Sequence, residues 1–207
     1  MNIELLRDNI IERRRQTSDD RACLVGISGI DASGKGFVAR RLSDEIEAQG
    51  LRVALINVDD WLDLPRIRFS DRNPGQHFYQ HALRLDEMFE RLVLPLKQDR
   101  EVLITMDHGE ETATSFRPHT YTFENIDIIL LEGIFIFKRA FARLFDLKIW
   151  IQCSFGNALR RAIERRQESL STEATIAAYK RIYFRAQRFH FEMDDPHDEA
   201  DLIFVNE

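Results

Sequence analysis

A short segment near the start of this 207-residue chain has the residue types and spacing that bind phosphate groups. It fits the pattern G-x-x-x-x-G-K and reads Gly29-Ile30-Asp31-Ala32-Ser33-Gly34-Lys35-Gly36, followed by Phe37. Glycines let the backbone curl so that successive N–H groups converge on phosphate oxygens, and the lysine reaches the β- and γ-phosphates of a nucleotide. We therefore expect residues 29–37 to bind ATP or GTP, with Lys35 taking part in catalysis.

One residue of this segment departs from the motif. Gly36 stands where the motif has Ser or Thr, whose hydroxyl group would bind Mg²⁺. If Mg²⁺ is used, we expect water, Ser33 or nearby acidic residues to supply the missing ligand. The departure also keeps open a second function, that of a nucleotide-binding sensor or partner-binding module with little transfer activity.

Acidic residues follow two other apolar runs of the sequence. Asp59 and Asp60 end the run at residues 52–58, and Glu132 ends the run at residues 127–131. Ligands of open parallel sheets bind at the carboxyl ends of the strands, so we expect these carboxylates to meet there. We predict that Asp59 accepts a proton from an attacking hydroxyl group or holds Mg²⁺, that Glu132 orients Mg²⁺ or its water, and that Asp60 contacts the substrate.

Asp107 and His108 follow a further apolar run, residues 101–106. They are candidates for contact with the substrate. A hairpin turn explains the same two residues equally well, since Asp is common in turns.

Arginines recur at helical spacing in the C-terminal third of the chain. Arg160, Arg161, Arg165 and Arg166 form one group, in which Arg161 and Arg165 share a helix face. Guanidinium groups stabilise the charge of a phosphoryl group in transfer, so this face is a candidate cover for the triphosphate. A solvated helix surface is an equally good explanation for any one of them. A second basic run, residues 180–188, contains aromatic residues and is better explained by the packing of an amphipathic helix.

These side chains need a scaffold, and the sequence predicts one of alternating strands and helices. Short apolar runs predict strands at residues 22–27, 52–58, 101–106, 127–131, 147–151 and 202–205. Helical spacing predicts helices at residues 3–14, 37–48, 81–94, 138–145, 156–167 and 172–188, with Gly50 as the left-handed cap of the second. A long loop is expected between residues 58 and 81. The pattern predicts an α/β fold, a three-layer α/β/α sandwich with a mostly parallel sheet.

Length and composition restrict the class of protein. A chain of 207 residues suits a single domain, and its 44% of hydrophobic and 31% of charged residues are typical of a globular protein. The net charge of -6 argues against nucleic acid or an anionic membrane as a partner. The expected partner is a small-molecule hydroxyl acceptor. Cys23 and Cys153 lie in apolar runs without a redox or zinc spacing, which together with a charged N-terminus predicts a cytoplasmic protein. The oligomeric state is not indicated, and a homo-oligomer stays open.

Taken together, these motifs resemble those of the uridine kinase and phosphoribulokinase group of P-loop kinases, in particular bacterial uridine kinase-like proteins. The resemblance covers nearly the whole chain after residue 21 and implies a single P-loop kinase domain over residues 1–207. Uridine kinases pair a G-x-S-G-x-x-x-S-G-K loop with a D-x-F-Y segment. Here Gly26-Ile27-Ser28-Gly29 through Lys35 is followed by Asp59-Asp60-Trp61-Leu62.

The resemblance implies roles for individual residues. Asp59 would be the general base toward the acceptor hydroxyl, Trp61 would replace the family's aromatic residue, and Glu132 in Leu131-Glu132-Gly133-Ile134 would coordinate Mg²⁺. A segment that runs from Pro65-Arg66 to Tyr79 would border the acceptor pocket. Arg161 and Arg165 resemble the arginines of a lid, at about residues 157–175, and Tyr183 with Gln187 resembles a tyrosine and glutamine pair near the end of the family's chains. The segment Ala200-Asp201-Leu202-Ile203-Phe204 of this chain resembles the A-D-V-I-I strand that closes the family's sequences.

Two departures from the family bear on the acceptor. Gly36 lacks the hydroxyl group, and Arg72 occupies the position of the acidic residue that binds ribose in uridine kinases. An arginine cannot accept a hydrogen bond from a sugar hydroxyl and prefers a carboxylate or phosphate. The sequence therefore leaves uridine, a phosphorylated sugar, pantothenate and glycerate open as acceptors. A nucleoside monophosphate kinase is a further alternative, but those that carry G-K-G continue with Thr where this chain has Phe37.

Overall fold

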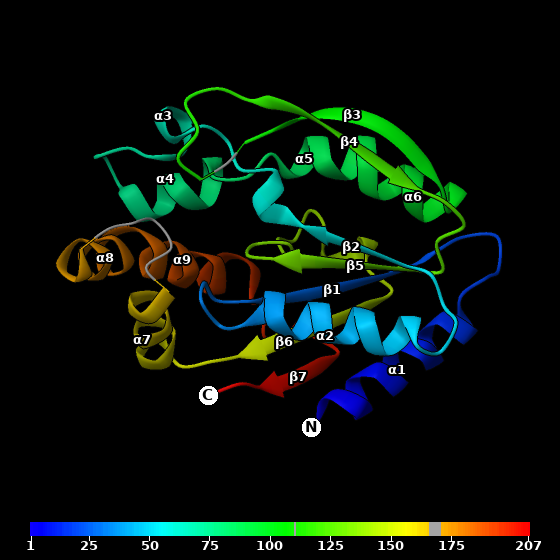
Figure 1. The fold of residues 1–207 in the computed structure, drawn as a ribbon. Coiled ribbons are helices and arrows are strands. Elements are labelled where there is room, and N and C mark those ends of the chain that lie inside the picture. Colours follow the sequence, from blue (N-terminus) through cyan, green and yellow to red (C-terminus); the bar gives the residue numbers. More distant parts are fainter. Residues whose placement is uncertain (110, 166–170) are drawn as a thin grey trace.

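A parallel β-sheet forms the centre of the molecule. The computed structural model describes residues 1–109, 111–165 and 171–207. Within them, five parallel strands pair in the order β2-β5-β1-β6-β7 (Figure 1). The strands are β1 (Cys23–Gly29), β2 (Val53–Asn57), β5 (Ile128–Gly133), β6 (Leu147–Gln152) and β7 (Leu202–Val205).

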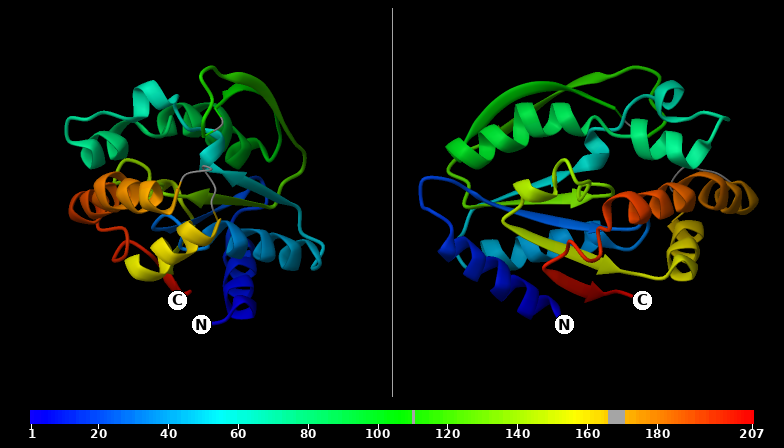
Figure 2. Two further views of the ribbon diagram at one scale, coloured as in Figure 1. Left: turned by 60° about the vertical axis from the view of Figure 1, so that its left-hand side comes forward. Right: turned by 180° about the vertical axis from the view of Figure 1, so that it is seen from behind.

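Helices cover both faces of this sheet because both faces of its strands are apolar. Val25 and Leu130 point to the side of α1 (Ile3–Gln16) and α2 (Lys35–Glu47), whose apolar residues complete one core cluster. Leu24 and Ile129 belong to the second cluster, on the opposite side. The two views of Figure 2 show the sheet between these helical layers. The predicted three-layer α/β/α sandwich is confirmed.

The second helical layer is built from several short pieces. They are α3 (Pro65–Arg68), α4 (Pro74–His81), α5 (Leu85–Met88), α6 (Leu94–Asp99), α7 (Phe155–Arg165), α8 (Thr172–Ala178) and α9 (Phe184–Asp194). π-Helical turns at Phe89–Val93 and Tyr179–Tyr183 join α5 to α6 and α8 to α9. Single 3₁₀ turns lie at Val58–Asp60 and Ala142–Leu144.

The structure corrects the expected strand at residues 101–106. This segment is β3 (Val102–His108), which pairs antiparallel with β4 (Arg117–Phe123) in a separate hairpin and does not join the parallel sheet. Its side chains alternate, with Met106 buried and Leu103 exposed, as in a hairpin that covers the core with one face only. Asp107 and His108 are thus the last residues of the strand, where they were expected to follow it.

Three further element predictions differ from the structure. The expected loop between residues 58 and 81 contains α3 and α4, each with a proline in its first turn, where the missing N–H costs nothing. The expected helix at 138–145 is only a 3₁₀ turn, and the last helix continues to Asp194. The helix expected at 156–167 is observed to Arg165, whereas Arg166 and Gln167 lie outside the described residues. Gly50 has a φ of 84°, as its predicted capping role requires.

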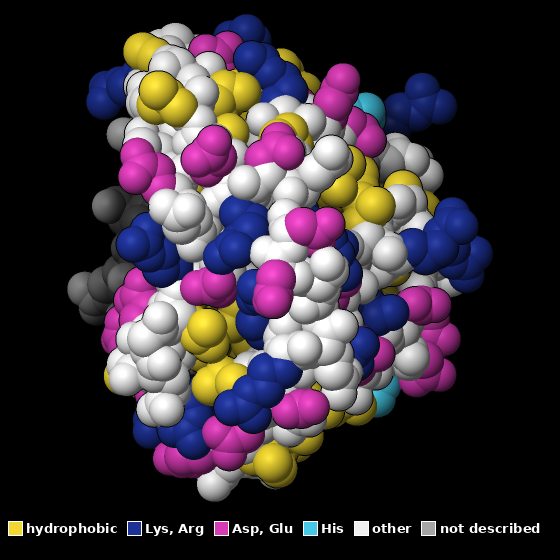
Figure 3. All heavy atoms as spheres, turned by 90° about the vertical axis from the view of Figure 1, so that its right-hand side faces the viewer, with side chains coloured by type: hydrophobic (Ala, Val, Ile, Leu, Met, Phe, Trp, Pro, Cys, Tyr) yellow, Lys and Arg dark blue, Asp and Glu magenta, His cyan; other side chains and the backbone are white. Residues whose placement is uncertain are grey.

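The surface at the amino ends of the strands, opposite the carboxyl ends, is electrostatically mixed. Figure 3 shows Lys and Arg side chains interspersed with Asp and Glu over this face. None of the helices in the described residues is long and apolar enough to cross a membrane.

Gly133 predicts a stability difference that tests this packing. A Cβ atom at Gly133 would overlap the side chain of Val58, whereas a Cβ at Gly156, in α7, would meet no atom within 4 Å. We expect Gly133→Ala to lower the free energy of unfolding by about 1 to 3 kcal/mol, as overpacked cores do. Gly156→Ala should leave it unchanged or raise it by up to about 1 kcal/mol, since alanine is the better helix former. Urea denaturation of both variants measures the difference, and equal stabilities would contradict this packing.

Candidate functional site

The phosphate-binding motif forms a tight loop between β1 and α2. Ala32 and Gly34 have positive φ angles of 56° and 92°, which turns the chain sharply at both residues. A side chain at Gly29 would come within 2.7 Å of the Ile151 carbonyl oxygen, so only glycine lets the loop pass this close to β6. Among the described residues, the N–H groups of Gly34, Lys35 and Gly36 donate no hydrogen bond to the protein. These amides at the start of α2 form a concave site suited to an anion.

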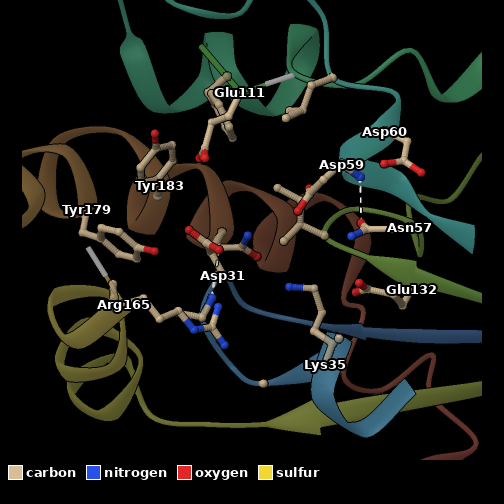
Figure 4. A pocket seen from close by; sticks show the side chains of 18 of the residues that line it. Asp31, Lys35, Asn57, Asp59, Asp60, Glu111, Glu132, Arg165, Tyr179 and Tyr183 are labelled. Atoms are coloured by element: carbon tan, nitrogen blue, oxygen red, sulfur yellow. Dashed lines mark hydrogen bonds between the residues drawn. The ribbon is translucent and has the colours of Figure 1, made fainter. Parts of the chain in front are cut away.

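The loop lies at one end of a cavity of about 640 Å³ at the carboxyl ends of the strands. Lys35 is buried at the cavity wall, and its Nζ lies 3.4 Å from the Ile30 carbonyl oxygen. Figure 4 shows the side chains of Lys35 and Glu132 extending into the same region of the cavity, below Asp59. One end of the cavity therefore combines free amides, one ammonium group and two carboxylates.

The sheet explains why Asp59 and Glu132 meet. Strands β2 and β5 are neighbours, and Asn57 is in register with Glu132. The 3₁₀ turn that follows β2 begins at Val58 and is capped by Asn57, whose Oδ1 accepts a hydrogen bond of 2.8 Å from the Asp59 amide. Asp59 is thereby placed directly over the end of β5.

The carboxylates of this end have perturbed acidities. Burial raises the pKa of Glu132 to about 7, against the opposing effect of Lys35. Burial in the cleft also raises the pKa of Asp59, again opposed by Lys35. Asp59 is exposed to the open cavity, whereas Glu132 is only 7% exposed.

Gly36 lies directly below Glu132. A Cβ atom at Gly36 would stand 3.1 Å from Glu132 Oε1, closer than ordinary contact. The glycine that departs from the motif thus leaves room for a carboxylate near the place where the motif puts its hydroxyl group. Arg40, one turn further along α2, also lines the cavity here.

The hairpin β3–β4 lines the cavity beside Asp60. A bridge between Trp61 and Gly109 attaches the hairpin to the segment after β2, and His108 Nδ1 lies 3.9 Å from Asp60 Oδ1. Burial raises the pKa of Asp60, and the neighbouring His108 opposes this rise. Asp60 and His108, each of which is predicted to contact the substrate, therefore line the cavity side by side.

The far end of the cavity is lined by α3, the hairpin loop, and the helix formed by α8 and α9. Figure 4 shows Glu111 pointing into the cavity from above and Tyr179 and Tyr183 from the side. The π-helical turn of residues 179–183 brings these two rings to 5.1 Å from one another. Arg68 is buried and donates a hydrogen bond to the Glu111 carbonyl oxygen. Gln187, which is 1% exposed, completes the wall.

Several predicted site residues lie outside the cavity wall. Trp61 is fully buried and stacks on Tyr121 at 5.9 Å, so it is a core residue. Tyr79 points away, and its hydroxyl group donates to Asp194 at 2.5 Å. Arg66, in α3, and Arg72, shortly before α4, are both exposed. Asp107 is exposed on β3.

The two predicted lid arginines separate. Arg165 lines the cavity, but Arg161 reaches behind the phosphate loop and donates to the Ser33 carbonyl oxygen at 3.1 Å. Within the loop, the residues that line the cavity are Asp31, Ala32, Gly34, Gly36 and Phe37. The cavity wall does not include Gly29, Ile30 or Ser33. The expected lid spans about residues 157–175, and of these, residues 166–170 lie outside the described residues.

Sequence reasoning missed much of the wall. The residues it did not select are Arg40, Asn57, Leu62, Gly109, Glu111, Ile134, Ala178 and Tyr179. Arg68 and Phe78 lie in the segment expected to border the acceptor pocket, and Ala162 and Thr175 lie in the expected lid, but none of these four was selected individually. Asn57 and Tyr179 carried usable signals, since Asn57 precedes the acidic pair and Tyr179 stands four residues before Tyr183. Glu111 carried none, because the course of the hairpin loop cannot be derived from its sequence.

The site fits Mg²⁺ that is held mainly by its nucleotide. In the described ranges no group of three or more His, Cys, Asp and Glu residues is placed to hold a metal ion by itself. Mg²⁺ in nucleotide sites usually keeps several waters and binds one or two carboxylates together with phosphate oxygens. Glu132 and Asp59 are the carboxylates that could take this role, because both lie at the end of the cavity that contains the phosphate loop.

Comparison with known proteins identifies the family. The model of the phosphoribulokinase/uridine kinase family matches residues 24–206. No curated protein matches the sequence significantly.

Solved structures share the fold at low sequence identity. A possible uridine kinase from Bacillus stearothermophilus is 20% identical, with a TM-score of 0.73 over 96% of this chain and 98% of that one. D-glycerate 3-kinase from Cryptococcus neoformans is 11% identical, with a TM-score of 0.66 over 98% and 94%. Phosphoribulokinase from Rhodobacter spheroides is 16% identical, with a TM-score of 0.58 over 91% and 71%. Since the family model spans nearly the entire chain and the cavity is built around its phosphate loop, the chain belongs to the phosphoribulokinase/uridine kinase family of P-loop kinases.

Proposed function

We propose that this protein transfers the γ-phosphoryl group of ATP, or of GTP, to a hydroxyl group of a small uncharged acceptor. The observation that carries the proposal is the meeting of Lys35, Asp59 and Glu132 at one end of a cavity of about 640 Å³. A volume of this order accommodates small-molecule ligands. The phosphate loop lies at the same end, so a bound triphosphate would present its γ-phosphate to Asp59.

The chain's own residues support an in-line transfer. The amides of the loop and Lys35 hold the phosphates, and Arg165, from α7, adds positive charge at the cavity wall. Asp59 accepts the proton of the acceptor hydroxyl as its oxygen bonds to the γ-phosphorus, and the bond from that phosphorus to the bridging oxygen breaks to release ADP. Mg²⁺, when bound with the nucleotide, supplies charge neutralisation between the β- and γ-phosphates. Glu132 would be its carboxylate partner above Gly36.

Charge at the far end of the cavity favours an uncharged acceptor. At this end Asp60 and Glu111 are acidic and Arg68 is basic, so the two carboxylates outnumber the guanidinium group, which keeps its charge while donating to the Glu111 carbonyl oxygen. In the described part of the chain, the buried Oε1 of Gln187 accepts no hydrogen bond. An unsatisfied buried acceptor is costly, so a ligand that offers hydroxyl or N–H donors is preferred.

Arg72 does not support the anionic acceptors that its position in the sequence suggested. It is exposed and takes no part in the cavity wall. The structural neighbours are named for acceptors as different as glycerate and, in one case, uridine, so the shared fold leaves the acceptor open. We infer a neutral sugar, polyol or nucleoside in preference to a sugar phosphate or a carboxylic acid.

An acceptor panel tests the proposed activity. Protein and Mg-ATP should release ADP with at least one neutral hydroxylated compound, among nucleosides, free sugars and polyols, well above the rate without acceptor. Glycerate, pantothenate and sugar phosphates should be poor substrates because the carboxylates repel them. Coupled-enzyme measurement of ADP gives the rates. Exclusive use of an anionic acceptor would overturn the acceptor class, and binding of ATP without any acceptor-dependent turnover would favour the sensor function.

Replacement of the proposed base should separate chemistry from binding. We expect Asp59→Asn to lower kcat by about 10² to 10⁴, the usual contribution of a general base, with the Kd for ATP little changed. Asp107→Asn is the matched control, because that carboxylate lies outside the cavity wall on the exposed side of β3. Steady-state kinetics and calorimetry measure both quantities. An equal effect of the two substitutions would remove Asp59 from the mechanism.

The buried carboxylate should also make stability depend on pH. The pKa of Glu132 rises from 4.5 to about 7 on folding, so between these values the native state holds a proton that the unfolded chain releases. Its contribution is fully present below pH 4.5 and is lost as pH rises through about 7. Without metal or nucleotide, the wild-type protein should lose up to about 3 kcal/mol more stability than Glu132→Gln between about pH 5 and about pH 8. Urea denaturation in a chelating buffer measures this difference, and identical pH dependences would show that Glu132 is solvated.

A further inference from the structure

The residue that follows β7 reaches the phosphate loop. Asn206 is fixed by its backbone, because its N–H donates to the Gln152 carbonyl oxygen at the end of β6, 2.9 Å away. From this position its side-chain Nδ2 donates a hydrogen bond of 2.7 Å to the carbonyl oxygen of Ser33. Residues 173 positions apart in sequence are thus joined beside the site.

Arg161 donates hydrogen bonds to both residues of this contact, Ser33 and Asn206. One nitrogen, NH1, donates to the Ser33 carbonyl oxygen at 3.1 Å and to the Asn206 carbonyl oxygen at 3.0 Å. The Ser33 carbonyl therefore accepts two hydrogen bonds from donors on two different elements. Because the Ser33 residue is fully buried, no water competes for that oxygen.

The next residue ties the same segment to the beginning of α7. The carboxylate of Glu207 accepts from the Ser154 amide at 3.0 Å, from the Ser154 hydroxyl at 2.9 Å and from the Asn157 side chain at 2.5 Å. Ser154 in turn caps α7 through the Asn157 amide, 3.3 Å away. The residues after β7 therefore connect the phosphate loop with the helix that carries Arg161.

The geometry of the peptide bond gives these contacts a consequence for the cavity. The carbonyl of Ser33 and the N–H of Gly34 belong to one planar trans unit and point in opposite directions. Two donors that hold the carbonyl behind the loop therefore direct the Gly34 N–H to the opposite side, and Gly34 lines the cavity. In the described ranges this N–H has no protein acceptor.

Contact between Asn206 and Gly34 is also close. A Cβ atom at Gly34 would overlap Nδ2 of Asn206. The φ of 92° favours glycine at this position, and a side chain here would displace the Asn206 amide from its hydrogen bond with Ser33.

We propose that Asn206 is a positioning residue for nucleotide binding: with Arg161 it fixes the peptide between Ser33 and Gly34 so that the Gly34 N–H faces the polyphosphate. This inference rests on the proposed function, since it assumes that the loop binds a nucleoside triphosphate. Asn206 acts through the loop and needs no contact with the nucleotide.

Asn206→Asp is the sharpest test, because it keeps the shape of the side chain and removes the donor. Two probes are used in calorimetry, an ATP analogue with a β,γ-imido bridge and inorganic tripolyphosphate, which has no base or ribose. We expect the Kd of both to rise about fivefold to tenfold, the effect of one lost hydrogen bond in the loop. In turnover assays the KM for ATP should rise, while kcat and the melting temperature stay near the wild-type values. Asn206→Ser, which removes the amide without adding charge, should act in the same direction.

Val205→Ala is the matched control, since Val205 is the preceding residue, is 62% exposed and lies outside the cavity wall. It should leave both Kd values unchanged. Weaker binding of the imido analogue with unchanged tripolyphosphate binding would overturn the proposal, because it would mean that Asn206 contacts the base or ribose directly. Unchanged binding of both probes by both Asn206 variants would also overturn it. Failure of the wild-type protein to bind either probe would overturn the proposed function together with this inference.

Discussion

The site depends on a charge balance around Lys35 that the sheet imposes. Strand β5 lies between β1 and β2, and Glu132 is in register with Ile27 on one side and with Asn57 on the other. The lysine after β1, the carboxylate of Asp59 after β2 and the carboxylate of Glu132 near the end of β5 are therefore brought into one small region, at the N-terminus of α2. Neither sign would be tolerated there alone, since an uncompensated buried charge is strongly destabilising. A nucleotide would enter a site that already holds charges of both signs.

Two parts of the chain build the remainder of the cavity in different ways. The phosphate end is made by the sheet and the turns that directly follow its strands, so its geometry is set by backbone hydrogen bonds. The acceptor end is made by side chains from α3, the β3–β4 hairpin and the helix of α8 and α9, which lie outside the sheet. Contacts such as Trp61 with Tyr121 and Tyr79 with Asp194 hold these elements in place from behind.

Sequence reasoning succeeded where chemistry and strand position coincide. The α/β fold, the phosphate loop, and the placement of Asp59, Asp60 and Glu132 at strand ends all follow from apolar runs that stop at polar residues. It failed at the hairpin, because β4 lies in a polar segment that does not show the pattern of a strand, so β3 was left without its antiparallel partner. Trp61 and Tyr79 were expected to contact the substrate but point away from the cavity. The spacing of residues does not say which side of a turn or of a short helix faces the core.

The hairpin has a consequence for how this scaffold can diversify. It supplies His108 and Glu111 to the acceptor end, and it is joined to the rest of the site by the bridge between Trp61 and Gly109, by the stacking of Trp61 on Tyr121 and by hydrogen bonds from Arg68 and Arg84 to its backbone carbonyls. Its loop can change in length or sequence without disturbing a single hydrogen bond of the central sheet. In the proposed function, acceptor recognition and phosphate binding would therefore rest on separate parts of the chain.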